Sequence, residues 1–204
     1  MQDYATLATF ALTSLLIEIT PGPNMAYLAL VAATEGRKSG YAAVAGVATG
    51  LFLVGLAAAL GLAALIGASF FAYQTLRWAG VAYLLWLAWD GWRGASEASE
   101  HAKLGSTPWQ FFRRGLLTNL LNPKAAVFYI AVLPGFLTPA AGVAETVSLT
   151  VIYVGVATFV HAGIVTATGT ARRWLSATDG RETAVRRILA VGLVAVAGWV
   201  LWKT

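Results

Sequence analysis

The sequence predicts an all-α integral membrane protein whose six transmembrane helices form an inverted 3+3 repeat. Of its 204 residues, 58% are hydrophobic and 11% are charged, whereas a soluble domain carries roughly 25% charged residues. The mean hydropathy is +0.70. Apolar stretches approach the length of about 20 residues that a helix needs to cross a bilayer at six places. We place these spans at about 4–34, 41–68, 71–92, 111–137, 147–168 and 188–202.

The first and fourth spans are predicted to be broken helices. Pro21-Gly22-Pro23 interrupts the first span, and Asn122-Pro123 interrupts the fourth. Proline cannot continue a helix, because it lacks the N–H group and its ring clashes with the carbonyl four residues back. In a bilayer such a break is tolerated only where it is buried in protein or lines a polar cavity. Matching breaks in two halves of a membrane protein are typical of a transport site.

The other four spans have no such break, and two of them belong to each half of the chain. The second span carries Gly46-x-x-x-Gly50, a spacing typical of close helix packing in membranes. One long polar connection, at about 93–110, separates two groups of three spans, so the second half must enter the membrane with opposite polarity. We therefore predict a single transporter domain over 1–204, with one repeat at about 1–92 and the other at about 111–204.

Basic residues predict the orientation. Most of the 14 Lys and Arg residues lie in the connections that follow the first, third and fifth spans. The positive-inside rule places these connections in the cytoplasm, so both termini are predicted to be periplasmic. This distribution accounts for the net charge of +5 without a nucleic-acid partner.

The two breaks are predicted to form a substrate site. Each break leaves N–H groups unpaired at the start of its second half, where the helix dipole is positive. Both positive ends converge near the midplane, where Lys124 adds a full charge and Glu18 supplies the opposite one. A zwitterionic amino acid carries one group for each of these charges. The predicted substrate-binding residues are Glu18, Thr20, Pro21, Gly22, Pro23, Asn24, Asn119, Asn122, Pro123 and Lys124.

Other interpretations of these residues stay open. A Glu18–Lys124 ion pair that merely clamps the two halves is one alternative. Asn119 and Asn122 are equally suited to capping or to hydrogen bonds between helices, and Thr20 to a local backbone partner. Glu18 is also a candidate proton carrier, because burial favours the neutral form of a carboxyl group. His161 is the second proton-coupling candidate, with a packing histidine as its alternative.

Several motifs resemble the LysE/RhtB family, the bacterial exporters of lysine, homoserine, threonine and related amino acids. The resemblance covers nearly the whole chain, and it departs from the family where many members carry an acidic residue and this chain has Leu51 and Phe52. The similar segments are Ile19-Thr20-Pro21-Gly22-Pro23-Asn24, Gly36-Arg37-Lys38-Ser39-Gly40, Ala79-Gly80-Val81-Ala82-Tyr83-Leu84, Gly115 to Lys124, and Leu133-Pro134-Gly135-Phe136. The resemblance implies proton-driven efflux across the bacterial inner membrane.

The leading hypothesis is a secondary active transporter that exports small amino acids of the threonine, homoserine or lysine kind by proton antiport. A membrane channel for small solutes or ions is the alternative, although no ring of charge or carbonyl filter is visible. Motifs of intramembrane enzymes are absent from the sequence, so no enzyme, cofactor or metal site is predicted. The expected partners are the amino acid, protons and the lipid bilayer, and glycine-rich helix faces suit a homodimer.

Overall fold

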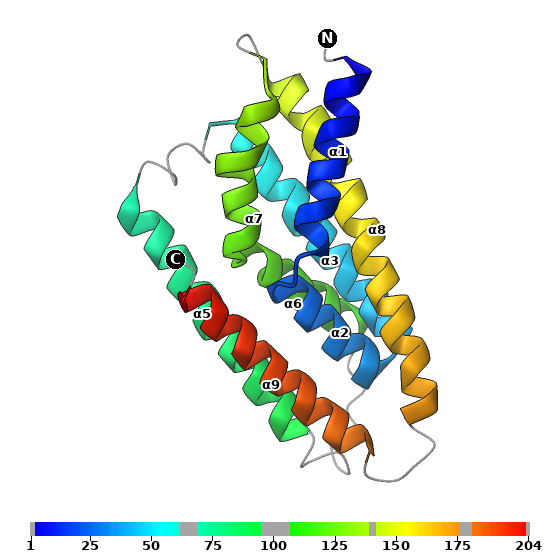
Figure 1. The fold of residues 1–204 in the computed structure, drawn as a ribbon. Coiled ribbons are helices and arrows are strands. Elements are labelled where there is room, and N and C mark those ends of the chain that lie inside the picture. Colours follow the sequence, from blue (N-terminus) through cyan, green and yellow to red (C-terminus); the bar gives the residue numbers. More distant parts are fainter. Residues whose placement is uncertain (1–2, 62–68, 95–106, 139–141, 176–180, 203–204) are drawn as a thin grey trace.

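The computed structural model describes residues 3–61, 69–94, 107–138, 142–175 and 181–202. Within these ranges the regular elements are all helical, as predicted (Figure 1). A π-helical turn, Phe128–Val132, and a 3-10 turn, Leu133–Phe136, continue α7. The α-helices are α1 (Tyr4–Ile19), α2 (Pro23–Glu35), α3 (Arg37–Ala59), α5 (Phe70–Gly94), α6 (Pro108–Leu120), α7 (Pro123–Val127), α8 (Val143–Leu175) and α9 (Arg181–Trp202).

Both predicted helix breaks lie where the prolines place them. Helix α1 ends at Ile19, and α2 begins at Pro23 after a bend of 61°. Helix α6 ends at Leu120, and the segment that begins at Pro123 is bent by 51°. In each case the proline occupies the first turn of the new helix, where its missing N–H group costs nothing and its fixed φ suits the helix.

The membrane spans are supported in part. In the described residues, α3 and the first 28 residues of α8 (Val143–Thr170) are each long and apolar enough to cross a bilayer. The number of candidate spans rises to four if α1 with α2, and α6 with the segment from Pro123 to Phe136, each count as one bent span. Within α5 a shorter stretch, Trp78–Trp89, is apolar. The six-span inverted repeat stays a prediction, and most of the predicted connection at 93–110 lies outside the described residues.

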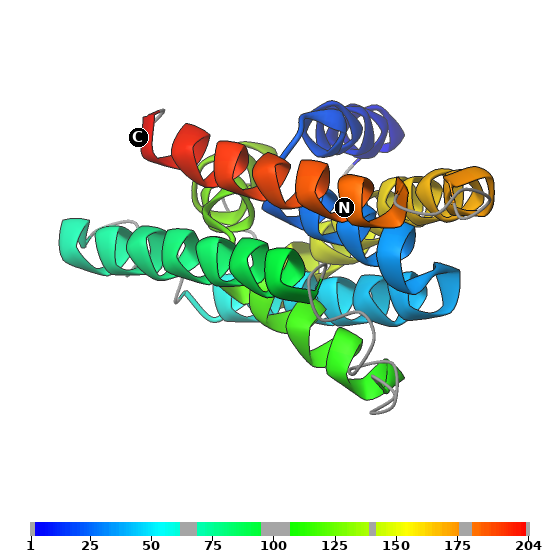
Figure 2. The ribbon, with the colours of Figure 1, turned by 90° about the horizontal axis from the view of Figure 1, so that it is seen from below.

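Helices α3 and α8 pack on each other and on the broken segments. Helix α3 packs against α6 and α8, whereas α8 also packs against α1 and α2. Helices α5 and α9 pack on each other along one side, and α9 reaches α2 (Figure 2). The beginnings of α1 and α8 lie at one end of the molecule, and the end of α2 and the beginning of α3 lie at the other (Figure 1). The two breaks therefore fall in the interior, between these ends.

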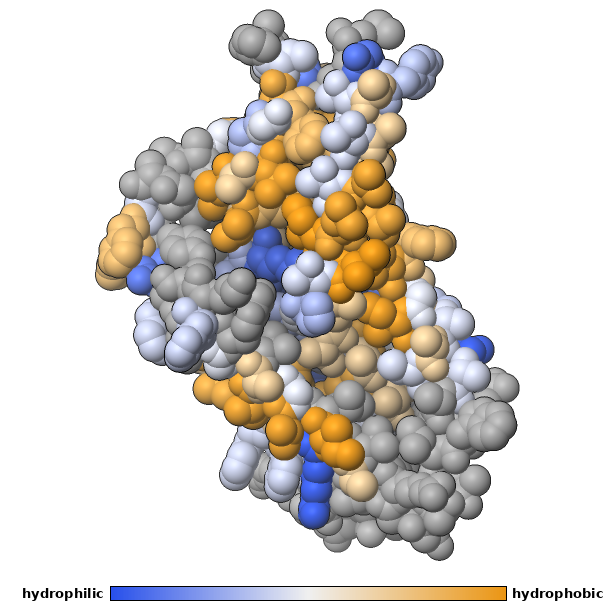
Figure 3. All heavy atoms as spheres, viewed as in Figure 1, coloured by the Kyte–Doolittle hydropathy of each residue, from blue (hydrophilic) through white to orange (hydrophobic). Residues whose placement is uncertain are grey.

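Large apolar side chains cover the outside of the bundle. Phe71 is 81% exposed and Phe159 is 78% exposed, and Figure 3 shows hydrophobic side chains around α1 and α7. A soluble monomer rarely exposes apolar patches of this extent. The surface fits a lipid environment.

Glycines allow α3 and α6 to cross at backbone contact. A Cβ atom added to Gly46 would lie 2.0 Å from the carbonyl oxygen of Phe112, and one added to Gly115 would lie 2.2 Å from that of Ala43. Neither carbonyl can move without bending its helix. The close packing predicted from Gly46-x-x-x-Gly50 is confirmed.

We expect Gly115→Ala to destabilise the protein by about 1–3 kcal/mol, the usual cost of overpacking, because its methyl group forces α3 and α6 apart. Thermal unfolding of the purified protein in detergent measures this loss. Gly155→Ala on α8 is the matched control, since nothing lies within 4 Å of its added Cβ. Equal melting temperatures for the two variants would contradict the close crossing.

Candidate functional site

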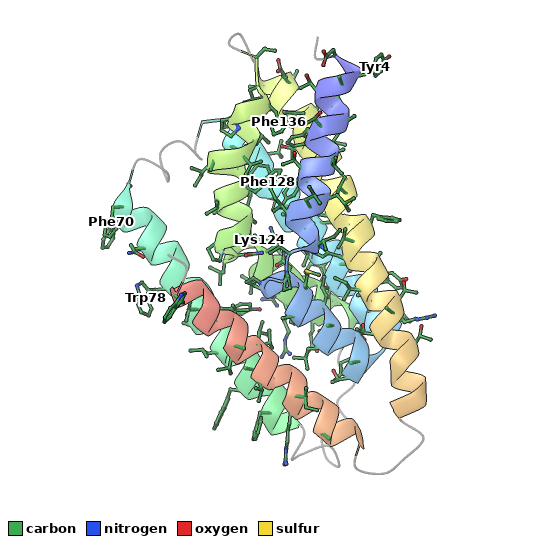
Figure 4. All side chains as sticks on the ribbon, in the orientation of Figure 1. Tyr4, Phe70, Trp78, Lys124, Phe128 and Phe136 are labelled. Atoms are coloured by element: carbon green, nitrogen blue, oxygen red, sulfur yellow. The ribbon has the colours of Figure 1, made fainter. Side chains whose placement is uncertain are left out.

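The two breaks meet inside the bundle through direct contacts between the first and fourth segments. Lys124 Nζ donates a hydrogen bond to the carbonyl oxygen of Thr20 at 2.8 Å. Asn24 Nδ2 donates to Asn119 Oδ1 at 2.9 Å. Figure 4 labels Lys124 at the level where α1 gives way to α2. The predicted convergence of the breaks is thus present in the structure.

Lys124 projects from the start of α7 across the first break. Its partner, the Thr20 carbonyl, lies at the break, where helical hydrogen bonding is interrupted by the prolines. The side chain passes close to Gly22, where an added Cβ would lie 3.2 Å from Lys124 Cδ. Lys124 is half-buried, and Figure 3 shows a hydrophilic patch among hydrophobic side chains at this level. The ammonium group is therefore within reach of a ligand.

Glu18 lies on the buried side of α1, and both of its oxygens face α8. Tyr153 donates its hydroxyl to Glu18 Oε1 at 2.7 Å, and His161 Nε2 lies 3.2 Å from Glu18 Oε2. Glu18 is 4% exposed and His161 is 1% exposed. Among the described residues, His161 is the basic side chain within 4.0 Å of the Glu18 carboxylate, and no Glu18–Lys124 contact falls within that distance. In this conformation the carboxylate does not clamp Lys124.

His161 and Tyr153 reach Glu18 from the same helix face. The spacing Tyr153, Ala157, His161 repeats every four residues, which places the three side chains on one side of a helix. Sequence reasoning missed Tyr153, although its spacing from His161 was a usable signal.

The Asn24–Asn119 pair leaves two buried polar atoms without a partner. Asn24 Oδ1 and Asn119 Nδ2 form no hydrogen bond, and both residues are at most 5% exposed. Asn119 also fills the space beside Gly50, where an added Cβ would lie 2.8 Å from Nδ2. The pair thus offers one free acceptor and one free donor between the broken segments.

The remaining predicted residues shape the breaks. Asn122 caps α7 by accepting a hydrogen bond from the backbone N–H of Lys124 at 3.0 Å. The Thr20 hydroxyl donates to the carbonyl of Leu16, a local backbone partner as considered from the sequence. Pro23 and Pro123 are buried at the starts of their helices, whereas Pro21 is exposed.

Residues from both breaks line one narrow pocket. Its lining side chains are Glu18, Gly22, Asn24, Met25, Asn122 and Lys124. No water-sized space remains between them in this conformation, so a ligand can enter only if the broken segments move apart. Within the described residues, no three His, Cys, Asp or Glu side chains gather as a metal site.

Comparisons with known proteins found a matching family model and similar proteins. A family model described as LysE type translocator matches residues 15–204. A homoserine/homoserine lactone efflux protein of Salmonella typhimurium is 33% identical over 132 residues, covering 64% of each chain. A leucine efflux protein of Enterobacter is 31% identical over 125 residues, covering 60% of this chain and 59% of the relative. The chain therefore spans less than two thirds of these relatives' lengths, and no solved structure matches it.

Proposed function

The chain belongs to the LysE type translocator family, and from this premise we propose that it is a secondary active transporter that exports small amino acids across the bacterial inner membrane by proton antiport. The relatives named for efflux of homoserine and of leucine suggest an uncharged amino-acid side chain. No enzymatic role is part of this proposal.

One observation carries the proposal: the Lys124 ammonium rests on the Thr20 carbonyl at the meeting point of two broken helices. A substrate carboxylate would offer Lys124 a charged acceptor in place of a neutral one, and charge-assisted hydrogen bonds are roughly twice as strong. Glu18 lines the same pocket and supplies the negative charge for a substrate ammonium. The pocket thus holds one group for each end of a zwitterion.

The helix contacts support an inverted repeat. Helix α3 of the first half packs on the broken segment of the second half, while α8 of the second half packs on the broken segment of the first. The third helices of the halves, α5 and α9, pack on each other. This exchange is what a two-fold relation between inverted halves requires. We place the end of α2 and the basic beginning of α3 in the cytoplasm, and the beginnings of α1 and α8 at the periplasmic side.

Proton coupling is assigned to Glu18 with His161 and Tyr153. Glu18 is a buried carboxyl group, and Tyr153 and His161, which contact it, carry groups that can give or take a proton. Their contacts at 2.7 and 3.2 Å link the pocket to α8, which packs on both halves. Protonation of Glu18 would therefore change the contacts that hold the halves together.

The test is counterflow in proteoliposomes containing the purified protein. Labelled homoserine or leucine is expected to accumulate when the vesicles hold the same unlabelled amino acid. A pH gradient with the acidic side inside the vesicles is expected to drive net uptake. Counterflow that is absent for both amino acids, and for threonine and lysine, would overturn the transport proposal. Ion conductance beyond about 10⁶ per second, far above carrier turnover, would favour the channel instead.

A further inference from the structure

In the part of the chain that the structure describes, the buried hydroxyl groups of Ser14 and Thr150 have no hydrogen-bond partner. Ser14 on α1 and Thr150 on α8 are both 0% exposed, and neither Ser14 Oγ nor Thr150 Oγ1 forms a hydrogen bond. Other helical hydroxyls donate to the carbonyl four residues back, including those of the buried Thr34 and Thr118. The Ser14 and Thr150 hydroxyls do not form this hydrogen bond to the preceding turn of their helix.

Each hydroxyl lies one helical turn from a residue of the Glu18–Tyr153 contact. Ser14 lies one turn before Glu18, and α1 buries only Phe10, Ser14 and Glu18, which form a single stripe. Thr150 lies one turn before Tyr153, whose hydroxyl donates to Glu18 Oε1. The Tyr129 hydroxyl donates to the Leu51 carbonyl and lies close enough to Thr150 to interact with it, while Thr150 Oγ1 has no partner in hydrogen-bonding geometry.

These groups extend from Glu18 toward the beginnings of α1 and α8. Thr146, one turn further along α8, is also buried, so the polar stripe continues on α8. On α1 the next turn carries Phe10, which packs against Phe128 and Phe136. The α1 side is therefore closed by aromatic rings, and the α8 side remains polar. Buried hydroxyls without partners are expected to bind water.

We propose that Ser14, Thr150 and Tyr153 form a hydrated file that carries the proton between Glu18 and the periplasm, apart from the pocket at Lys124. The proposal rests on the proposed proton antiport. A hydronium ion on the file gives its proton to the Glu18 carboxylate, which leaves a neutral carboxylic acid and water, and the reverse transfer releases the proton. The ionisable groups around Glu18 are His161 and Tyr153 on α8, Lys124 on α7 and Tyr129 on the π-helical turn.

The physical basis is that a water chain needs polar anchors at short intervals. Removing one hydroxyl leaves a gap in hydrocarbon where water has too few partners. The substrate pocket lies on the Lys124 side of Glu18 and contains neither Ser14 nor Thr150. Proton movement should thus fail while the pocket still binds and exchanges substrate.

The test uses Ser14→Ala and Thr150→Val, which keep side-chain shape nearly unchanged, in proteoliposomes with a pH-sensitive dye trapped inside. Outward flow of homoserine, or of leucine if the wild-type protein exchanges that instead, is expected to acidify the interior. We expect this acidification to slow by about tenfold or more in each variant, equivalent to a barrier increase of about 1.4 kcal/mol. Counterflow without a pH gradient is expected to stay within about twofold of wild type.

Two controls separate the hydroxyl from its shape. Thr150→Ser keeps the hydroxyl and is expected to retain proton movement. Thr34→Val removes a buried hydroxyl that donates to its own helix and is expected to change neither measurement.

Wild-type proton movement in both Ser14→Ala and Thr150→Val would overturn the file while leaving proton antiport intact. Counterflow without any proton movement in the wild-type protein would overturn antiport and the file together. Transport that requires sodium in place of the pH gradient would indicate that the two hydroxyls bind a metal cation, and it would also overturn the proposal.

Discussion

Lys124→Ala is expected to abolish the proposed amino-acid transport while the protein still inserts and folds. The ammonium group is the cation that lines the pocket and that meets the first break through the Thr20 carbonyl. Loss of one partner from a largely buried charged pair costs about 2–5 kcal/mol. That range corresponds to a loss of substrate affinity of roughly thirtyfold to several thousandfold. Counterflow in proteoliposomes measures the loss.

The matched control is Lys38→Ala, because Lys38 is an exposed lysine at the start of α3. It removes the same charge far from the pocket and is expected to transport as wild type does. Size-exclusion chromatography in detergent checks that both variants remain folded. Unaltered counterflow in Lys124→Ala would remove Lys124 from the substrate site and with it the main argument for a zwitterion pocket.

The sequence was sufficient to predict the breaks, because proline acts locally. Pro23 and Pro123 begin their helices regardless of what packs around them, since the ring excludes the preceding helical turn. The charges of Glu18 and Lys124 were equally visible, because an ionisable side chain in an apolar stretch is costly unless it is used. Local chemistry and the cost of burial thus indicated where a candidate site lies.

The partners of these groups depend on contacts between distant segments, which no local rule gives. Asn24 and Asn119 are 95 residues apart in the chain, and Tyr153 meets Glu18 across 135 residues. An ion pair between Glu18 and Lys124 was a reasonable expectation from charge alone. In the structure Glu18 instead contacts Tyr153 and His161 on α8, because α8 packs against the buried face of α1. Lys124 donates to the carbonyl oxygen of Thr20.

This division of partners suggests how substrate binding and proton binding compete. Lys124 must leave the Thr20 carbonyl to bind a carboxylate, and the pocket must widen to admit the substrate. Glu18, in turn, must leave Tyr153 or His161 to meet a substrate ammonium. A proton on Glu18 neutralises the charge that an ammonium needs, so the two ligands are expected to exclude each other, as antiport requires.

Glu18→Gln is expected to abolish both counterflow and uptake driven by a pH gradient. The amide has nearly the shape of the carboxyl group, yet it neither attracts an ammonium nor carries a proton. It also replaces the carboxylate that lies 3.2 Å from His161 Nε2, and a buried polar group that loses its partner costs about 1–3 kcal/mol of stability. We expect a loss of more than about hundredfold in either flux, measured with labelled homoserine or leucine.

Glu35→Gln serves as the matched control, since Glu35 ends α2 far from the break and its amide variant should transport normally. The double variant Glu18→Gln/His161→Gln distinguishes a lost function from a lost fold. It removes the unpaired histidine, so it is expected to recover the melting temperature that Glu18→Gln loses but not the transport. Recovery of transport in the double variant would show that Glu18 acts only by holding His161, and it would withdraw Glu18 from both substrate and proton binding.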